Sequence, residues 1–181
     1  MDYQLLGQDI CKAAKAAFTE LAERSRPETL CAFALYSDES AMTVCPAANT
    51  SSHLTTAQAD NPEFMADYKF SPSEWRFDGE GAEEAFAAIS RQLAYRPESN
   101  EAGDEAAFDT FRSGVFEACA NALKTLKAEG FFKMPASSPI LLLFSVPDAS
   151  ITHREVALVK DLNDADIARE YERWARTFNE L

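Results

Sequence analysis

The sequence has no long apolar run and no basic leader segment. Its longest apolar stretch, Ile140–Phe144, is far shorter than the roughly 18 residues that a membrane span needs, and it suits a buried strand. The N-terminus lacks a basic region followed by an apolar core, which is the pattern of a signal peptide. We therefore expect a cytoplasmic protein that does not cross a membrane.

Basic residues are also scarce. The chain has 17 Lys and Arg against 30 Asp and Glu, a net charge of −13. That charge repels nucleic acid and anionic membranes, so we expect neither as a partner. Two interpretations remain: the charge keeps the protein soluble, or it complements a basic protein partner. From position 78 to position 105 the acids outnumber the bases by eight to two. These acids are Asp78, Glu80, Glu83, Glu84, Glu98, Glu101, Asp104 and Glu105.

Signatures of catalysis and of cofactor binding are missing as well. The two histidines, His53 and His153, have no metal-type partner at helical spacing, and the six glycines form no phosphate-binding loop. No serine lies in the GxSxG pattern of a hydrolase, and the four cysteines include no CxxC pair. The sequence therefore predicts no cofactor, no metal and no catalytic residue, and it favours a protein that is not an enzyme.

What the chain does have is enough apolar material for a sizeable core. It contains 181 residues, 46% of them hydrophobic, including thirteen Phe. A chain of this length and composition is typical of one folded domain, here residues 1–181, and not of a disordered segment.

The stretch 30–46, LCAFALYSDESAMTVCP, predicts a β-hairpin. Its expected arms are Cys31–Tyr36 and Ala41–Cys45, joined by the turn Ser37–Ser40. Pairing Tyr36 with Ala41 gathers the large apolar side chains on one face, which favours that register. Pro46 is expected to end the second arm, because proline cannot donate a hydrogen bond to a ladder.

Hydrophobic spacing predicts helices and two further strands along the rest of the chain. The apolar stretch 139–146 is typical of a strand buried on both faces, so we place it in the middle of the sheet. The fold class expected is α+β, with about four strands in a mostly antiparallel sheet, an N-terminal hairpin and several packed α-helices. The strands are 74–78 and 139–146, and the helices are 3–24, a short one near 53–59, 82–95, about 104–129, 152–162 and 165–178. Asp104 is the expected N-cap of the longest helix and follows an acidic loop at 97–103, and Thr152 and Glu155 have the spacing of a capping box.

Trp75 is the residue with the most open interpretation. It follows a proline-containing connector, so it could be a core residue or the anchor of a binding cleft beside the hairpin. The candidate binding surface contains the polar and aromatic residues near it and the start of the acidic region. These residues are Tyr36, Asp38, Glu74, Trp75, Arg76, Asp78, Glu80, Glu83 and Glu84.

The order of four motifs carries a resemblance. FALYSDES is followed by AANTSSHL, then by YKFSPSEWRF, then by an apolar strand and a C-terminal helical region containing LND. This order resembles a bacterial family known only as a domain of unknown function, whose members have a similar ALY-Asp hairpin, an NT loop and an EW motif. The resemblance covers roughly Leu5 to Phe178. It implies a small α+β protein with no assigned reaction, and for relatives encoded near toxin genes it implies an immunity role.

Three functions are consistent with these features. The first is a cytosolic protein-binding module, with toxin immunity as its specific form, whose acidic region meets a basic protein such as a toxin. The alternative is a small-ligand-binding protein, or an enzyme of unrecognised type, with a cleft near Trp75 and the 30–46 hairpin. The third is a subunit of a homo-oligomer.

Overall fold

A computed structural model describes residues 1–94, 105–132, 139–147 and 151–178. These residues form seven α-helices and a four-stranded sheet, so the predicted α+β class is confirmed. The strands are β1 (Leu30–Tyr36), β2 (Cys45–Thr50), β3 (Phe77–Asp78) and β4 (Leu141–Ser145). The helices are α1 (Tyr3–Arg24), α2 (Ser51–Asp60), α3 (Met65–Phe70), α4 (Glu83–Ala94), α5 (Glu105–Ala128), α6 (His153–Leu162) and α7 (Ala165–Ala175).

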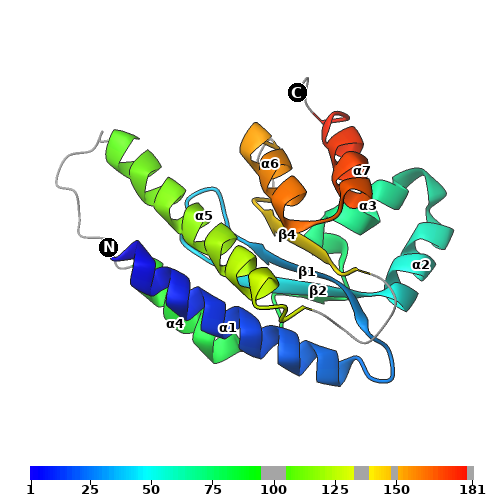
Figure 1. The fold of residues 1–181 in the computed structure, drawn as a ribbon, viewed down its shortest axis with the longest axis horizontal. Helices are drawn as coiled ribbons and strands as arrows, with labels where there is room; N and C mark the ends of the chain where they lie inside the picture. The colour runs from blue at the N-terminus through cyan, green and yellow to red at the C-terminus, as the bar shows by residue number, and fades with distance from the viewer. Residues whose placement is uncertain (95–104, 133–138, 148–150, 179–181) are drawn as a thin grey trace.

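The sheet has the strand order β3-β2-β1-β4. β1 pairs antiparallel with β2, β2 pairs antiparallel with β3, and β4 pairs parallel with β1. The expectation of about four strands is confirmed. The sheet is mixed rather than purely antiparallel, because a long connection returns the chain from β3 through α4 and α5 to the far edge of β1 (Figure 1).

The predicted hairpin is wrong in its second arm. β1 lies where expected, but its partner begins at Cys45, and Tyr36 pairs with Cys45 rather than with Ala41. Residues 37–44 form a connecting loop, in which Asp38 accepts hydrogen bonds from the backbone N–H groups of Ser40, Met42 and Thr43. These side-chain bonds satisfy the backbone locally, so the segment needs no ladder.

Pro46 lies inside β2 instead of ending a strand. Its carbonyl oxygen accepts from the Gly79 N–H at 3.0 Å, so the peptide polar groups of Pro46 face the β3 side. β3 covers only two residues, and its ladder pairs with Ala47 and Ala48. The missing N–H of Pro46 therefore removes no bond to β1, which explains why the strand accepts proline.

Two further strand predictions need correction. Only Phe77–Asp78 of the predicted strand 74–78 is extended in the ladder, because Pro72–Glu74 forms a 3₁₀ turn before it. β4 lies at an edge of the sheet, not in its middle. Its first four side chains, Leu141–Phe144, are apolar because both faces of the strand are buried there, and this pattern does not distinguish an edge strand from a central one when a helix covers the edge.

Helix predictions were more accurate. α1 spans the predicted residues, and Asp2 caps its N-terminus by accepting from the N–H groups of Gln4 and Leu5 at 3.0 Å. α6 begins with the predicted capping box between Thr152 and Glu155. The predicted N-cap Asp104 of the longest helix and the acidic loop 97–103 lie outside the described residues.

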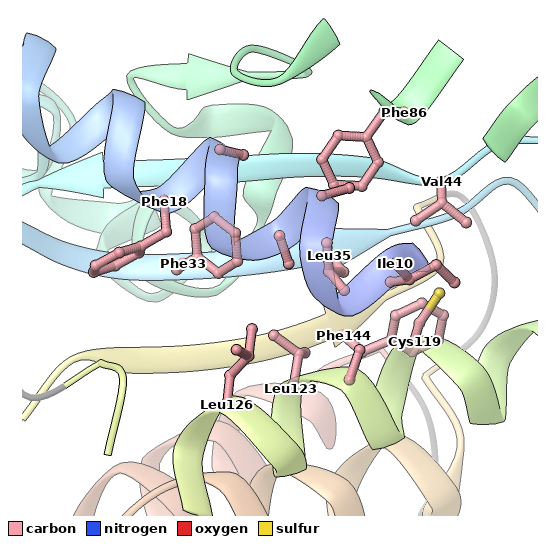
Figure 2. Close-up of a cluster of buried hydrophobic side chains, with 14 of the residues drawn as sticks. Ile10, Phe18, Phe33, Leu35, Val44, Phe86, Cys119, Leu123, Leu126 and Phe144 are labelled. Atoms are coloured by element: carbon pink, nitrogen blue, oxygen red, sulfur yellow. The ribbon is translucent and has the colours of Figure 1, made fainter. Parts of the chain in front are cut away.

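The sheet separates two apolar layers. α1, α4 and α5 cover one face, where Phe18, Phe33, Leu35, Leu123 and Phe144 interlock (Figure 2). α3, α6 and α7 cover the other face (Figure 1). Alternate residues of each strand enter the two layers: Phe33 and Leu35 enter the first, Ala32 and Ala34 the second.

α6 spans both layers at the β4 edge. Its Leu158 and Leu162 belong to the first layer, and its Val156 and Val159 belong to the second. The helix therefore covers the outer edge of β4, the position at which an open sheet is most exposed. No helix among the described residues is long and apolar enough to cross a membrane.

Candidate functional site

Trp75 is buried in the second layer. Its side chain is 4% exposed and packs in the same cluster as Phe70 and Tyr171. It does not line the cavities that the described residues form beside α1, α5, α6 and α7. This position agrees with the core interpretation of Trp75.

Tyr36 of β1 and Asp78 of β3 bond to each other across β2, which lies between these two strands. The Tyr36 hydroxyl donates to Asp78 Oδ1 at 2.6 Å. The pKa of Tyr36 is raised above its ordinary value. Burial is the main cause, and the hydrogen bond to Asp78 is the second. The hydrogen bond between these two side chains therefore links β1 to β3 and has a structural role.

Asp38 organises the loop between β1 and β2. Burial alone would raise the pKa of Asp38, but hydrogen bonds from the Thr43 hydroxyl and from three backbone N–H groups lower it below the ordinary value. Thr43 donates to Asp38 through both its N–H, at 2.8 Å, and its hydroxyl, at 2.7 Å. Asp38 is therefore a loop-stabilising carboxylate whose oxygens already accept several hydrogen bonds.

The NT motif (Asn49-Thr50) and the EW motif (Glu74-Trp75) of the sequence analysis lie next to each other in the structure. Asn49 Oδ1 accepts from the N–H groups of Thr50 at 2.9 Å and Arg76 at 3.4 Å. The His53 ring nitrogen lies 3.1 Å from the Glu74 carbonyl oxygen. Two buried donors here, Asn49 Nδ2 and Trp75 Nε1, have no hydrogen-bond partner in the part of the chain that the structure describes. The segments thus form a structural junction between β2, α2 and β3.

Three acidic members of the candidate surface, Glu80, Glu83 and Glu84, lie at or just before the start of α4. Arg24 forms ion pairs with Glu80 and with Glu20. Glu83 accepts from the Gly81 N–H at 3.4 Å, and Glu83 and Glu84 are exposed in the first turn of α4. Arg76, also exposed, pairs with Glu28 at 3.8 Å. Glu98, Glu101 and Asp104 lie outside the described residues.

A cavity of about 390 Å³ opens where β1 and β4 end, between α5 and α6. We call it the α5–α6 pocket. Phe116 and Phe144 contribute apolar walls, and the centroids of their rings lie 5.4 Å apart. The charged lining residues are Glu39 of the 37–44 loop, Arg112 of α5, and Arg154 and Glu155 of α6.

The arginines of this pocket have exposed partners outside it. Arg112 pairs with Asp109 at 2.8 Å, and Arg154 pairs with Glu117 at 2.7 Å. Exposed ion pairs of this kind contribute little to stability, so a bound anion can compete for either guanidinium. The guanidinium groups of Arg112 and Arg154 can therefore exchange their present carboxylate partners for an anionic ligand in the pocket.

Glu155 lies in the pocket wall at the first turn of α6. Its carboxylate accepts from the Thr152 N–H at 3.0 Å, which completes the capping box. Burial raises the pKa of Glu155 above its ordinary value, although the Thr152 hydrogen bonds oppose this. The sequence revealed the capping box but not the pocket, because the pocket depends on how α5 packs against α6.

Another hollow, of about 670 Å³, is a groove between α1 and α5. It is an open surface where small residues, including Gly7 and Ala118, let the helices lie close together. The described residues include no group of three or more His, Cys, Asp or Glu that could hold a metal ion. All four cysteines are free.

Comparison with known proteins identifies the family but no reaction. A family model described as a domain of unknown function, DUF4303, matches residues 10–164. No curated protein and no solved structure matches the chain. The match spans most of the chain and agrees with the resemblance inferred from its motifs, so this chain belongs to the DUF4303 family.

Proposed function

We propose that the protein binds a small molecule in the α5–α6 pocket. The observation that supports this proposal is the composition of the cavity wall: phenylalanine rings beside two guanidinium groups and two carboxyl groups. Ligand sites are typically apolar cavities of a few hundred Å³ with a few polar groups that fix the orientation of the ligand. This function corresponds to the small-ligand alternative derived from the sequence, with the cleft beside the 37–44 loop instead of beside Trp75.

The position of the pocket in the sheet supports the same function. β1 and β4 run parallel, and the pocket lies beyond their carboxyl ends, at Val146 and the 37–44 loop. In open sheets with parallel strands, ligands bind in the crevice outside those ends. The first turn of α6 also lines the pocket, where Thr152 adds a hydroxyl group beside Arg154 and Glu155.

The charges of the wall favour a zwitterionic ligand with an apolar side chain. Arg112 and Arg154 suit a carboxylate, Glu39 and Glu155 suit an ammonium group, and Phe116 and Phe144 suit the apolar part. These features together match the chemistry of a hydrophobic α-amino acid.

Calorimetry with three related compounds tests this proposal. Phenylalanine carries both charges, 3-phenylpropanoate lacks the ammonium group, and 2-phenylethylamine lacks the carboxylate. We expect phenylalanine to bind most tightly, and we expect Arg112→Ala with Arg154→Ala to weaken its binding at least tenfold. Arg173→Ala removes an exposed guanidinium of α7 that is outside the pocket wall and serves as the control. No binding of any compound, or equal binding by both variants, would overturn the proposal.

A second candidate function is protein binding through an acidic surface in the cytoplasm, with toxin immunity as its specific form. The supporting observation is that Glu83 and Glu84 are exposed in a chain of net charge −13, while the nearby Arg24 is already paired with Glu20 and Glu80. Such a surface favours a basic partner and a salt-sensitive complex.

Retention of a basic protein from lysate of the source organism tests this second function. We expect retention at low salt, partial release at high salt, and loss of retention with Glu83→Lys and Glu84→Lys together. Asp60→Lys with Glu63→Lys makes the same change in charge at exposed positions outside this surface. Equal loss with both pairs would show that net charge, not this surface, governs binding.

A further inference from the structure

Glu155 also lines a second cavity of about 390 Å³, whose wall contains residues of α3 and α7. We call it the aromatic pocket. Four rings line it, from Phe70, Tyr171, Trp174 and Phe178. Glu155 also contributes to its wall, together with three serine residues. Its lining thus combines aromatic surface with hydroxyl groups and one carboxyl group.

The rings form a connected and anchored wall. The centroid of Trp174 lies 5.5 Å from that of Phe70, 5.3 Å from that of Tyr171 and 5.1 Å from that of Phe178. Trp174 Nε1 donates to Asp67 Oδ1 at 3.1 Å, which fixes the orientation of the indole. Phe70 is buried, whereas Phe178 is 56% exposed. The wall therefore extends from the core to solvent.

The electrostatics of this wall differ from those of the α5–α6 pocket. Among the described residues, no Lys or Arg lines the aromatic pocket, and Glu155 is its carboxyl group. Burial and then the charge of Glu155 raise the pKa of Tyr171, which agrees with a carboxylate close to that ring. Outside the pocket, the Lys69 ammonium lies 5.3 Å from the Phe70 centroid and pairs with Glu170. The same ring cluster thus already attracts one cation.

We propose that the aromatic pocket binds an organic cation, specifically an alkylated ammonium group. The negative faces of aromatic rings attract such a group, and quaternary ammonium ions are typically recognised by several rings together. A net charge of −13 favours the approach of a cation from solution. This site is distinct from the zwitterion site proposed above, although Glu155 contributes to both walls.

Choline and its uncharged carbon isostere, 3,3-dimethyl-1-butanol, separate the charge from the shape of the ligand. The two compounds are titrated into the ¹⁵N-labelled protein while the indole N–H signals of Trp174 and Trp75 are followed by NMR. We expect a saturable shift of the Trp174 signal with choline and little change of the buried Trp75 signal. We expect the neutral isostere to bind at least fivefold more weakly. An equal response to both compounds, or no saturable shift, would overturn the proposal.

Phe178→Ala and Phe64→Ala form a matched pair of variants. Both side chains are large and about half exposed, but only Phe178 lines the aromatic pocket. Because each removes an exposed ring, both proteins should remain folded. We expect Phe178→Ala to weaken choline binding by about two- to fivefold and Phe64→Ala to leave it unchanged. Equal affinities of the two variants would place the binding elsewhere.

Discussion

The side-chain amide of Asn163 forms two hydrogen bonds with the backbone of Leu142. Asn163 Oδ1 accepts from the Leu142 N–H, and Asn163 Nδ2 donates to the Leu142 carbonyl oxygen, each at 2.8 Å. Leu142 lies in the edge strand β4, so the amide takes the place that a neighbouring strand would occupy. Asn163, which follows α6, thus satisfies the backbone N–H and carbonyl groups on the outer side of Leu142.

Asn163→Ala should lower the free energy of unfolding by about 1–3 kcal/mol, because it leaves a backbone donor and acceptor of β4 without partners. Urea unfolding measures this change. Asn121→Ala, at an exposed position of α5, is the control and should change stability by less than about 0.5 kcal/mol. Equal stabilities of the two variants would show that water replaces the Asn163 bonds without loss.

Two glycines at the α1–α5 contact should respond differently to alanine. A Cβ at Gly114 would lie 2.4 Å from the Tyr3 ring, whereas a Cβ at Gly7 would lie 3.8 Å from its nearest neighbour. Gly7→Ala should stabilise the protein by up to about 1 kcal/mol through helix propensity. Gly114→Ala should be about 1–2 kcal/mol less stable than Gly7→Ala, because the Tyr3 ring must move.

Removal of the Tyr3 ring provides the check for this contact. In a Tyr3→Ala background the two glycine substitutions should have similar effects in thermal unfolding. A difference that persists without the ring would mean that backbone contacts between α1 and α5 cause it.

Tyr36→Phe should make stability less dependent on alkaline pH. Tyrosine in the unfolded chain ionises near pH 10, and the folded protein holds the pKa of Tyr36 higher, so the folded state retains a proton that the unfolded state loses. Wild-type stability should therefore fall as pH rises above about 10, and that of Tyr36→Phe should fall less steeply. Urea unfolding between pH 8 and 11 measures both slopes. Equal slopes of stability against pH for the wild type and Tyr36→Phe would contradict the raised pKa of Tyr36. Tyr3→Phe is the control variant.

Glu155→Gln should gain stability relative to the wild type as pH rises. The folded pKa of Glu155 is raised, so the stability that it contributes is complete below its unfolded value near 4.5 and decreases as pH rises through the folded value. The neutral amide of the variant does not titrate, so its contribution has no such dependence.

Glu28→Gln should lose stability relative to the wild type as pH rises, which is the opposite of the change expected for Glu155→Gln. Hydrogen bonds from the Ser52 and Thr50 hydroxyl groups lower the pKa of Glu28, so the stability that this residue contributes grows as pH rises from the folded pKa toward the unfolded value near 4.5 and is complete above it. From about pH 3 to pH 7, the stability of the variant minus that of the wild type should increase for Glu155→Gln and decrease for Glu28→Gln, with the Glu28 change complete by about pH 5. Differences of the same sign would contradict one of the two directions.

Elements with a strong local signal were predictable from the sequence. The apolar spacing of α1 and the capping box of α6 are set by residues within one or two helical turns, so their limits could be derived without the structure. β1 has the same advantage, because LCAFALY is apolar and bounded by polar residues.

The second strand was misplaced because its composition is unusual for a strand. CPAANT contains proline, alanines and asparagine, while the loop before it contains Met42 and Val44. Only tertiary contacts select β2: its small alanines lie in the two apolar layers, Asn49 accepts from the Arg76 N–H, and Thr50 caps α2. The same limitation applies to both pockets, whose walls combine residues from α5, α6 and α7 that no single motif contains.

The parallel pairing of β1 with β4 also has a consequence for how the chain folds. Ala32 pairs with Leu141, and most of the sequence lies between them. Contacts between such distant residues slow folding, because a large loop must close before they form. During synthesis, β1 and β2 leave the ribosome long before β4 and α6, so the outer edge of β1 stays unpaired in the meantime. That interval exposes the nascent protein to aggregation through strand pairing, and chaperones would act on it at this stage.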